Sequence, residues 1–122
     1  MKKTLLFIIL LISAICFSQK VEFNKITEEG NFKEYLSKNK KVIQVGDTLN
    51  IKFPRSGNAF TFITQGNAPC GTILSNTKNI ITKIKSVGTD KRGYKIFLAF
   101  KGYGLLPVFV EYESALETGE IN

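Results

Sequence analysis

Apolar and polar residues alternate with a period of two over much of the chain, and turn-forming residues separate the alternating segments. Successive side chains of a β-strand point to opposite faces, so this alternation is typical of strands that bury one face. We therefore expect a mainly β domain, a small antiparallel barrel or sandwich, with an edge strand or an ordered lead-in at 20–26. The six segments expected to form its strands are 42–45, 49–53, 60–63, 79–87, 94–101 and 106–112.

Two short segments depart from the alternation and predict helical structure. Residues 31–36 carry apolar side chains at i, i+3 and i+4 behind Asn31, a candidate helix cap, so we expect a short N-terminal helix there. Ser114 is a candidate cap for a C-terminal helical turn over 115–118. Gly119 follows at the position where many helices end in a left-handed residue. The expected helical content is therefore small.

The turn at Gly46–Asp47 and the strand after it resemble part of a known architecture. The segment Val45–Ile51 resembles the opening strand of SH3-like and other small barrels. This resemblance favours an SH3-like barrel over a sandwich. The best hairpin signal lies further along the chain, at Gly88–Gly93, where two glycines enclose a polar loop between two alternating segments.

Residues 1–18 have the organisation of a secretory signal peptide. Two lysines precede an apolar stretch, Leu5–Phe17, that is shorter than the roughly 20 residues needed to span a bilayer. Cleavage after this segment leaves 19–122 as a single β-rich domain, exported to the periplasm or out of the cell, with no transmembrane segment in the mature chain. Lipid anchoring through Cys16 is not expected, because Ile15 occupies a position where a lipobox requires a small residue.

The composition excludes several classes of catalytic site. The chain has no histidine, which removes Ser-His-Asp and Cys-His arrangements and every zinc site that uses imidazole. Cys70 is the sole cysteine of the mature sequence; a buried apolar role is favoured over a nucleophile, and an intermolecular disulfide is a third interpretation. Glu111, Glu113, Glu117 and Glu120 cluster near the C-terminus. Glu111 alternates with Val110 and Tyr112 and is expected to face solvent; for Glu113 and Glu117, four positions apart, a solvated face is favoured over a catalytic pair. We therefore expect no enzyme activity, no cofactor and no metal.

Basic residues concentrate in the expected hairpin over 79–101 and are candidate binding residues. The chain carries 17 basic and 10 acidic residues, a net charge of +7, and removal of the two leader lysines lowers it to +5. Lys83, Lys85 and Lys95 share one sheet face if the hairpin pairs in its simple register, and Arg92 lies in its loop. Such a stripe attracts a polyanion such as lipopolysaccharide phosphate, an acidic glycan or DNA. The alternative is that these lysines keep an exposed strand edge soluble.

Two further positions are candidate binding residues, and one motif is rejected. Tyr103 lies between two glycines, which turn the backbone and expose the ring for stacking on a sugar or docking a partner; folding back over a barrel end is the alternative. Arg55, in a turn-rich segment, is a similar candidate. The run Arg92-Gly93-Tyr94 begins like an RNA-binding signature, but Lys95 occupies a position that requires glycine or alanine, so no RNA partner is expected.

The leader and the C-terminal third resemble a known group of sequences. The runs 91–108 and 112–121, together with the leader ending Phe17-Ser18-Gln19, resemble small uncharacterised exported proteins of the Bacteroidota. The resemblance implies export and assigns no functional residue. We expect a non-catalytic binding module at the cell envelope or outside the cell, with an anionic envelope component or a protein as partner. The alternative is a structural or inhibitory protein-interaction subunit of an envelope complex.

Overall fold

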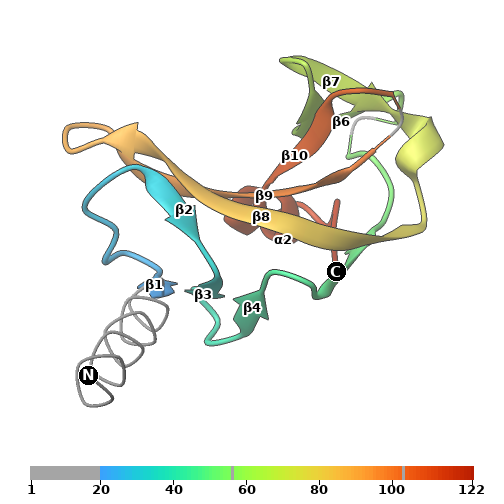
Figure 1. Cartoon of the computed structure of the whole chain (residues 1–122). Helices are drawn as coiled ribbons and strands as arrows, with labels where there is room; N and C mark the ends of the chain where they lie inside the picture. The colour runs from blue at the N-terminus through green and yellow to red at the C-terminus, as the bar shows by residue number, and fades with distance from the viewer. Residues whose placement is uncertain (1–19, 56, 103) are drawn as a thin grey trace.

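The computed structural model describes residues 20–55, 57–102 and 104–122, so the expected signal peptide, with Cys16, and Tyr103 lie outside the described residues. The described chain is mainly β, with mostly antiparallel sheets and a short helix near the C-terminus (Figure 1). This confirms the expected mainly β fold, and the sheets fit a sandwich, whereas an SH3-like barrel stays a prediction. The elements are β1 (Lys20–Glu22), β2 (Gly30–Phe32), β3 (Glu34–Leu36), β4 (Val42–Gln44), β5 (Thr48–Ile51), β6 (Ala59–Gln65), β7 (Ala68–Gly71), η1 (Thr72–Leu74), β8 (Thr77–Thr89), β9 (Gly93–Lys101), β10 (Pro107–Glu111) and α2 (Tyr112–Glu117).

A seven-stranded sheet forms the body of the fold. Its strands lie in the order β2-β8-β9-β10-β6-β7, and β5 pairs with the first part of β8. Within it, β8 and β9 form a long hairpin, which pairs from Thr89 and Gly93 at the turn to Ile81 and Phe100 at the far end. The register is irregular just after Ile81. The turn of this hairpin lies where the sequence predicts one.

Residues 31–36 form parts of two short strands, which corrects the predicted N-terminal helix. Phe32 of β2 lies opposite Ile84 of β8. Tyr35 of β3 lies opposite Ile43 of β4 and is fully buried. Helical spacing of three apolar residues is a weak local preference, and pairing with strands elsewhere in the chain overrides it. As a result, Tyr35 enters a second sheet.

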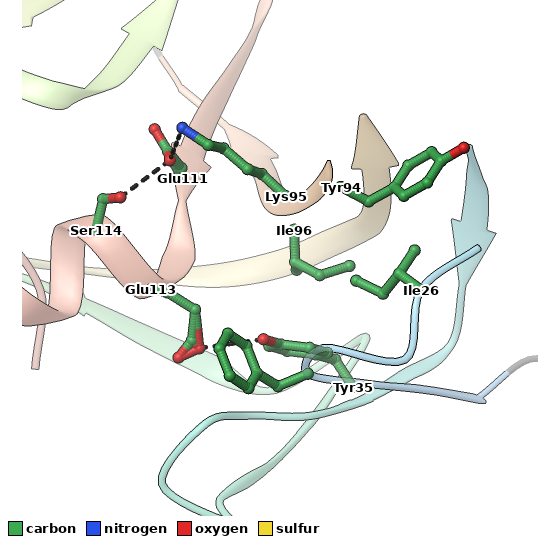
Figure 2. A pocket seen from close by; sticks show the side chains of 9 residues that line it. Ile26, Tyr35, Tyr94, Lys95, Ile96, Glu111, Glu113 and Ser114 are labelled. Carbon is green, nitrogen blue, oxygen red and sulfur yellow. Dashed lines mark hydrogen bonds and ion pairs between the residues drawn. The ribbon is translucent and has the colours of Figure 1, made fainter. Parts of the chain in front are cut away.

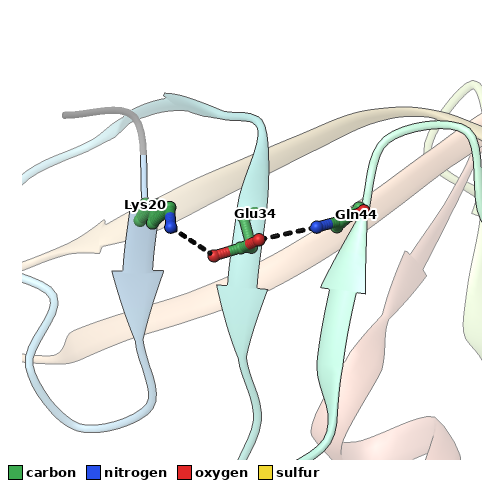
Figure 3. A network of polar contacts seen from close by, with 3 residues as sticks. All are labelled: Lys20, Glu34 and Gln44. Carbon is green, nitrogen blue, oxygen red and sulfur yellow. Dashed lines mark hydrogen bonds and ion pairs between the residues drawn. The ribbon is translucent and has the colours of Figure 1, made fainter. Parts of the chain in front are cut away.

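This second sheet has three strands, in which β3 lies between β4 and a parallel β1. Glu34 on β3 links both neighbours (Figure 3): its Oε1 accepts a hydrogen bond from Gln44 Nε2 at 2.7 Å, and its Oε2 lies 3.3 Å from Lys20 Nζ. The Gln44 hydrogen bond and then the Lys20 ammonium lower the pKa of Glu34, because both favour its charged form. The carboxylate therefore joins the first described strand to the sheet.

The helix α2 begins at Tyr112, directly after β10, rather than at residue 115 as predicted. Ser114 lies inside the helix instead of capping it, and its Oγ donates a hydrogen bond to Glu111 Oε1 at 2.9 Å. Tyr112 is buried, so the earlier start adds a core side chain to the helix. The helix ends as predicted, because Gly119 has a φ of 80°, a left-handed conformation that glycine adopts without strain.

Side chains from both sheets and from α2 share one buried cluster. On β9, Ile96, Leu98 and Phe100 point into this cluster. Because strand side chains alternate, the odd-numbered residues of β9 point to the opposite face of the sheet. The largest fully buried hydrophobic side chains are Tyr35, Ile51, Phe60, Ile63, Ile84, Leu98, Phe100, Val108 and Val110.

Glu120, one of the clustered C-terminal glutamates, is fully buried, which its sequence neighbourhood did not indicate. Its Oε2 accepts hydrogen bonds from the backbone N–H groups of Thr61 at 2.8 Å and Arg55 at 3.2 Å. Its Oε1 accepts one from the backbone N–H of Phe62 at 2.9 Å. The side chain therefore anchors the start of β6 and the loop before it to the C-terminal end of the chain.

Candidate functional site

The outer face of the β8–β9 hairpin brings three of the predicted binding residues together. Cross-strand partners of an antiparallel pair point to the same side of the sheet. The pairs on the outer face are Lys83↔Ala99, Lys85↔Phe97 and Val87↔Lys95. Lys83, Lys85 and Lys95 therefore lie on one sheet face, as the sequence predicted for the simple register.

Two phenylalanines lie among these lysines. Phe97 of β9 and Phe109 of β10 are half-buried on the same face, because Phe109 lies opposite Ala99. The Nζ of Lys85 lies 4.5 Å from the centroid of the Phe109 ring, well within the range of a cation–π contact. Lys101, exposed and two residues beyond Ala99, extends the set along β9. We call Lys83, Lys85, Lys95, Lys101, Phe97 and Phe109 the basic face.

Glu111 is the carboxylate that the register brings to the basic face. It lies opposite Phe97, and its Oε1 is 3.0 Å from Lys95 Nζ. The side chain of Lys95 is 66% exposed and that of Glu111 is 15% exposed. A pair this open to solvent contributes at most about 1 kcal/mol. It offsets the charge of Lys95, so the positive excess of the basic face lies at Lys83, Lys85 and Lys101.

The other predicted binding residues lie outside the basic face. Arg92 is exposed in the turn of the β8–β9 hairpin, where its backbone N–H donates a hydrogen bond to Thr89 Oγ1 at 3.1 Å. Arg55 is exposed in the loop before β6 and lines a cavity of about 530 Å³ beside the C-terminal part of α2. Tyr103 lies outside the described residues. The structure thus gathers three of the six predicted residues.

A smaller cavity of about 200 Å³ lies next to the basic face, where β9, α2 and the segment after β1 meet (Figure 2). Lys95 of the basic face and its ion-pair partner Glu111 both line this cavity. Small-molecule sites are typically about 300–1,000 Å³, so this cavity has room for one side chain or a small group. Its lining residues are Phe23, Ile26, Tyr35, Tyr94, Lys95, Ile96, Glu111, Glu113 and Ser114.

The polar groups of this cavity are held by hydrogen bonds across the fold. The Tyr35 hydroxyl donates to Glu113 Oε2 at 3.1 Å, and the backbone N–H of Lys38 approaches the same oxygen at 3.4 Å. The sequence gives no sign of the contact between Tyr35 and Glu113, because 78 positions separate the two residues and no local motif joins them. Two residues of this cavity had a signal in the sequence: Lys95 was a candidate binding residue, and alternation near the end of β10 predicted that Glu111 faces outward.

Burial favours the protonated forms of two side chains, Tyr35 in the wall of the cavity and Cys70 in the core of the fold. Burial, and then the neighbouring Glu113, raise the pKa of Tyr35. Burial also raises the pKa of Cys70, which lies in the core as a small apolar side chain and is disfavoured as a thiolate nucleophile. Among the described residues, no group of three or more cysteine, aspartate or glutamate side chains could hold a metal ion. What the site offers is positive charge, aromatic surface and hydrogen bonding.

The raised pKa of Tyr35 predicts an alkaline limit to stability. Tyr35 keeps its proton in the folded protein, whereas in the unfolded chain it ionises at its usual pKa of 10.0. The contribution of protonated Tyr35 to the stability of the fold is complete below that pH. It is lost as the pH rises, because ionisation then favours the unfolded chain. We expect the melting temperature of Tyr35→Phe to fall less steeply than that of the unmodified protein between about pH 9 and 11, followed by circular dichroism. Equal slopes would contradict this role of Tyr35.

Comparison of the chain with protein-family models, with curated proteins and with solved structures gives no match. In the part of the chain that the structure describes, no helix combines the length and the apolar character needed to cross a membrane. The functional proposal therefore rests on the geometry and chemistry of the basic face and the cavity beside it.

Proposed function

We propose that this protein is an exported, non-catalytic binding module whose basic face recognises an anionic component of the cell envelope. The observation that carries the proposal is the gathering of Lys83, Lys85 and Lys101 around Phe97 and Phe109 on one face of the sheet. The signal-like leader supports export. The protonated state favoured for Cys70 and the lack of histidine support a binding role over catalysis.

The distribution of charge along the chain favours recognition over a role of these lysines in solubility alone. Segment 57–111, which contains β6 to β10, has seven basic and two acidic residues. The rest of the mature sequence has eight basic and eight acidic residues. Mixed charges are sufficient for solubility. A region with a strong excess of one sign attracts a partner of the opposite sign and steers its approach.

The arrangement on the basic face fits a ligand with repeated negative charges. Lys83 and Lys85 lie roughly 7 Å apart along β8, given the rise of a strand. The Phe109 ring restrains Lys85 through the cation–π contact, which reduces the entropy that its side chain loses on binding. Lysine presents a compact charge without the fixed geometry of arginine. Such a face suits a polymer or a surface better than a single small anion.

Reversing the two central charges tests this proposal. The double variant Lys83→Glu with Lys85→Glu should bind heparin, a soluble polyanion, at least ~30-fold more weakly at low salt, since each lysine contributes about 1 kcal/mol near an anionic surface. Salt should also weaken binding of the unmodified protein. Affinity is measured by titration at several ionic strengths.

The matched control for charge is the double variant Lys25→Glu with Lys41→Glu. Both lysines are exposed and lie outside the basic face, in the segments that follow β1 and precede β4. This variant has the same net charge as the first and should retain most of the affinity. Equal loss in the two double variants would show that net charge alone drives binding and would refute recognition by the basic face.

A second candidate function is that of a protein-interaction subunit, and one observation favours it. A cavity of about 500 Å³ runs beside α2, lined by Phe23, Lys38, Asn39, Glu113, Leu116 and Glu117. Phe23 is 40% exposed there, so a partner could bury its ring. Affinity purification from native cells separates the candidates: a stoichiometric protein partner supports this second function, and a glycan or lipid supports the first.

A further inference from the structure

The turn between β6 and β7 and the loop between β9 and β10 lie side by side at one end of the larger sheet (Figure 1). Gln65 Nε2 donates a hydrogen bond to the carbonyl oxygen of Leu106 at 2.8 Å. A Cβ atom added at Gly66 would lie 2.9 Å from Leu106 Cδ1, so this leucine packs directly over the glycine. The two connections therefore form one surface, residues 66–69 and 104–107, which we call the apolar tip.

The apolar tip exposes two adjacent leucines. Leu105 is fully exposed and Leu106 is 56% exposed. A single exposed apolar residue needs no explanation, because much of any protein surface is apolar. Two leucines that protrude together among uncharged neighbours mark an interaction site. The other residues of the tip, all exposed, are Gly66, Asn67, Ala68, Pro69, Gly104 and Pro107.

The basic face begins directly behind the apolar tip. Lys101 lies opposite Pro107 at the base of the loop. Lys83 lies opposite Ala99, two residues further along β9, or roughly 7 Å in a strand. Apolar side chains in front of a layer of lysines match the two zones of an anionic bilayer, its acyl boundary and its head-group phosphates.

We infer that the anionic component recognised by this protein is a lipid surface. Leu105 and Leu106 enter the interfacial region of the bilayer, and Lys101, Lys83 and Lys85 contact head-group phosphates. A bilayer needs no complementary shape, whereas a stable protein interface buries about 800 Å² on each partner, far more than two leucines provide. This inference rests on the proposed function and specifies the ligand of the basic face.

Vesicle binding tests the inference. The protein used is the expected mature chain, residues 19–122. We expect it to co-sediment with vesicles of phosphatidylglycerol and phosphatidylethanolamine and not with vesicles of phosphatidylcholine alone. The variant Leu105→Ser with Leu106→Ser should bind the anionic vesicles at least about tenfold more weakly, because most of the apolar area that enters the bilayer is gone. It should bind heparin as the unmodified protein does, because the basic face is intact.

The variant Ile73→Ser with Ile80→Ser is the matched control. These isoleucines are 69% and 55% exposed and lie outside the apolar tip, so this variant should bind vesicles normally. If the Leu105 and Leu106 variant still binds anionic vesicles normally, or if the unmodified protein binds heparin but no vesicles, the lipid inference is wrong and the proposed function stands. Absence of binding to both heparin and vesicles would overturn both.

A fluorescent reporter gives an independent measurement. The chain contains no tryptophan, so Leu105→Trp introduces a single indole at the tip, and Ile73→Trp introduces one elsewhere. Anionic vesicles should shift the emission of the Leu105→Trp protein to shorter wavelength and leave that of the Ile73→Trp protein unchanged. A shift that appears without lipid, as the protein concentration rises, would instead indicate that a second copy of the chain covers the tip.

Discussion

Replacing Glu120 by alanine should remove about 3–5 kcal/mol from the free energy of unfolding, because three backbone N–H groups together lose their acceptor, a fully buried carboxylate. Those donors are the N–H groups of Arg55, Thr61 and Phe62, at 2.8–3.2 Å from the carboxylate. A domain of this size is stable by roughly 5–15 kcal/mol, so the variant should lose a large fraction of its stability. The measurement is the free energy of unfolding in urea, followed by circular dichroism.

Two further variants separate the effect of the Glu120 hydrogen bonds on stability from the effect of removing a carboxylate near the C-terminus. Glu117→Ala removes an exposed carboxylate at the end of α2 and should change stability by less than about 0.5 kcal/mol. Glu120→Gln keeps one acceptor oxygen but brings an amide N–H towards the backbone donors, so we expect an intermediate loss. A loss below about 1 kcal/mol in Glu120→Ala would show that water or a local rearrangement replaces the carboxylate.

Replacing Gly88 by alanine should destabilise the β8–β9 hairpin by about 2–4 kcal/mol, combining backbone strain with a steric clash. Gly88 has a φ of 153°, and a Cβ atom there would fall on the carbonyl oxygen of Gly93 across the hairpin. The strands must separate near the turn to relieve this contact. The measurements are the unfolding free energy and heparin affinity, because the same register aligns Lys85 and Lys95 on the basic face.

Gly93→Ala is the matched control for this second prediction. Gly93 also has a positive φ, 81°, but no atom lies within 4 Å of the position that a Cβ would take. The free energy of unfolding of this variant should fall only by the conformational cost of a left-handed residue, about 1–2 kcal/mol. The difference between the two variants measures the clash. Equal losses would mean that the hairpin absorbs the extra methyl group at Gly88 without opening.

The hairpin and the strand after it were predictable because their signals are local and repeated. Every second position of the strand after the turn holds a large apolar residue, namely Tyr94, Ile96, Leu98 and Phe100, and a glycine bounds the turn on each side. The same local information placed Lys83, Lys85 and Lys95 on one face, because a hairpin with a short loop has few possible registers. Much of the basic face therefore follows from spacing within twenty residues.

The N-terminal helix was predicted wrongly because its signal was short. Phe32, Tyr35 and Leu36 satisfy helical spacing over little more than one turn. Pairing of Phe32 with β8 and of Tyr35 with β4 supplies backbone hydrogen bonds and burial that an isolated turn of helix lacks. The partners of these residues lie far along the chain, so no local pattern marks them.

Local spacing thus specifies a β-rich domain, its central hairpin and a stripe of lysines, because side-chain alternation and turn chemistry act between near neighbours. Long-range packing specifies the rest. It places Phe109 under Lys85, brings Glu111 to Lys95, joins Tyr35 to Glu113 and buries Glu120. The local sequence around a charged residue does not show whether its side chain faces water or accepts hydrogen bonds from the backbone inside the fold. Its surroundings come from segments that only the folded chain brings together.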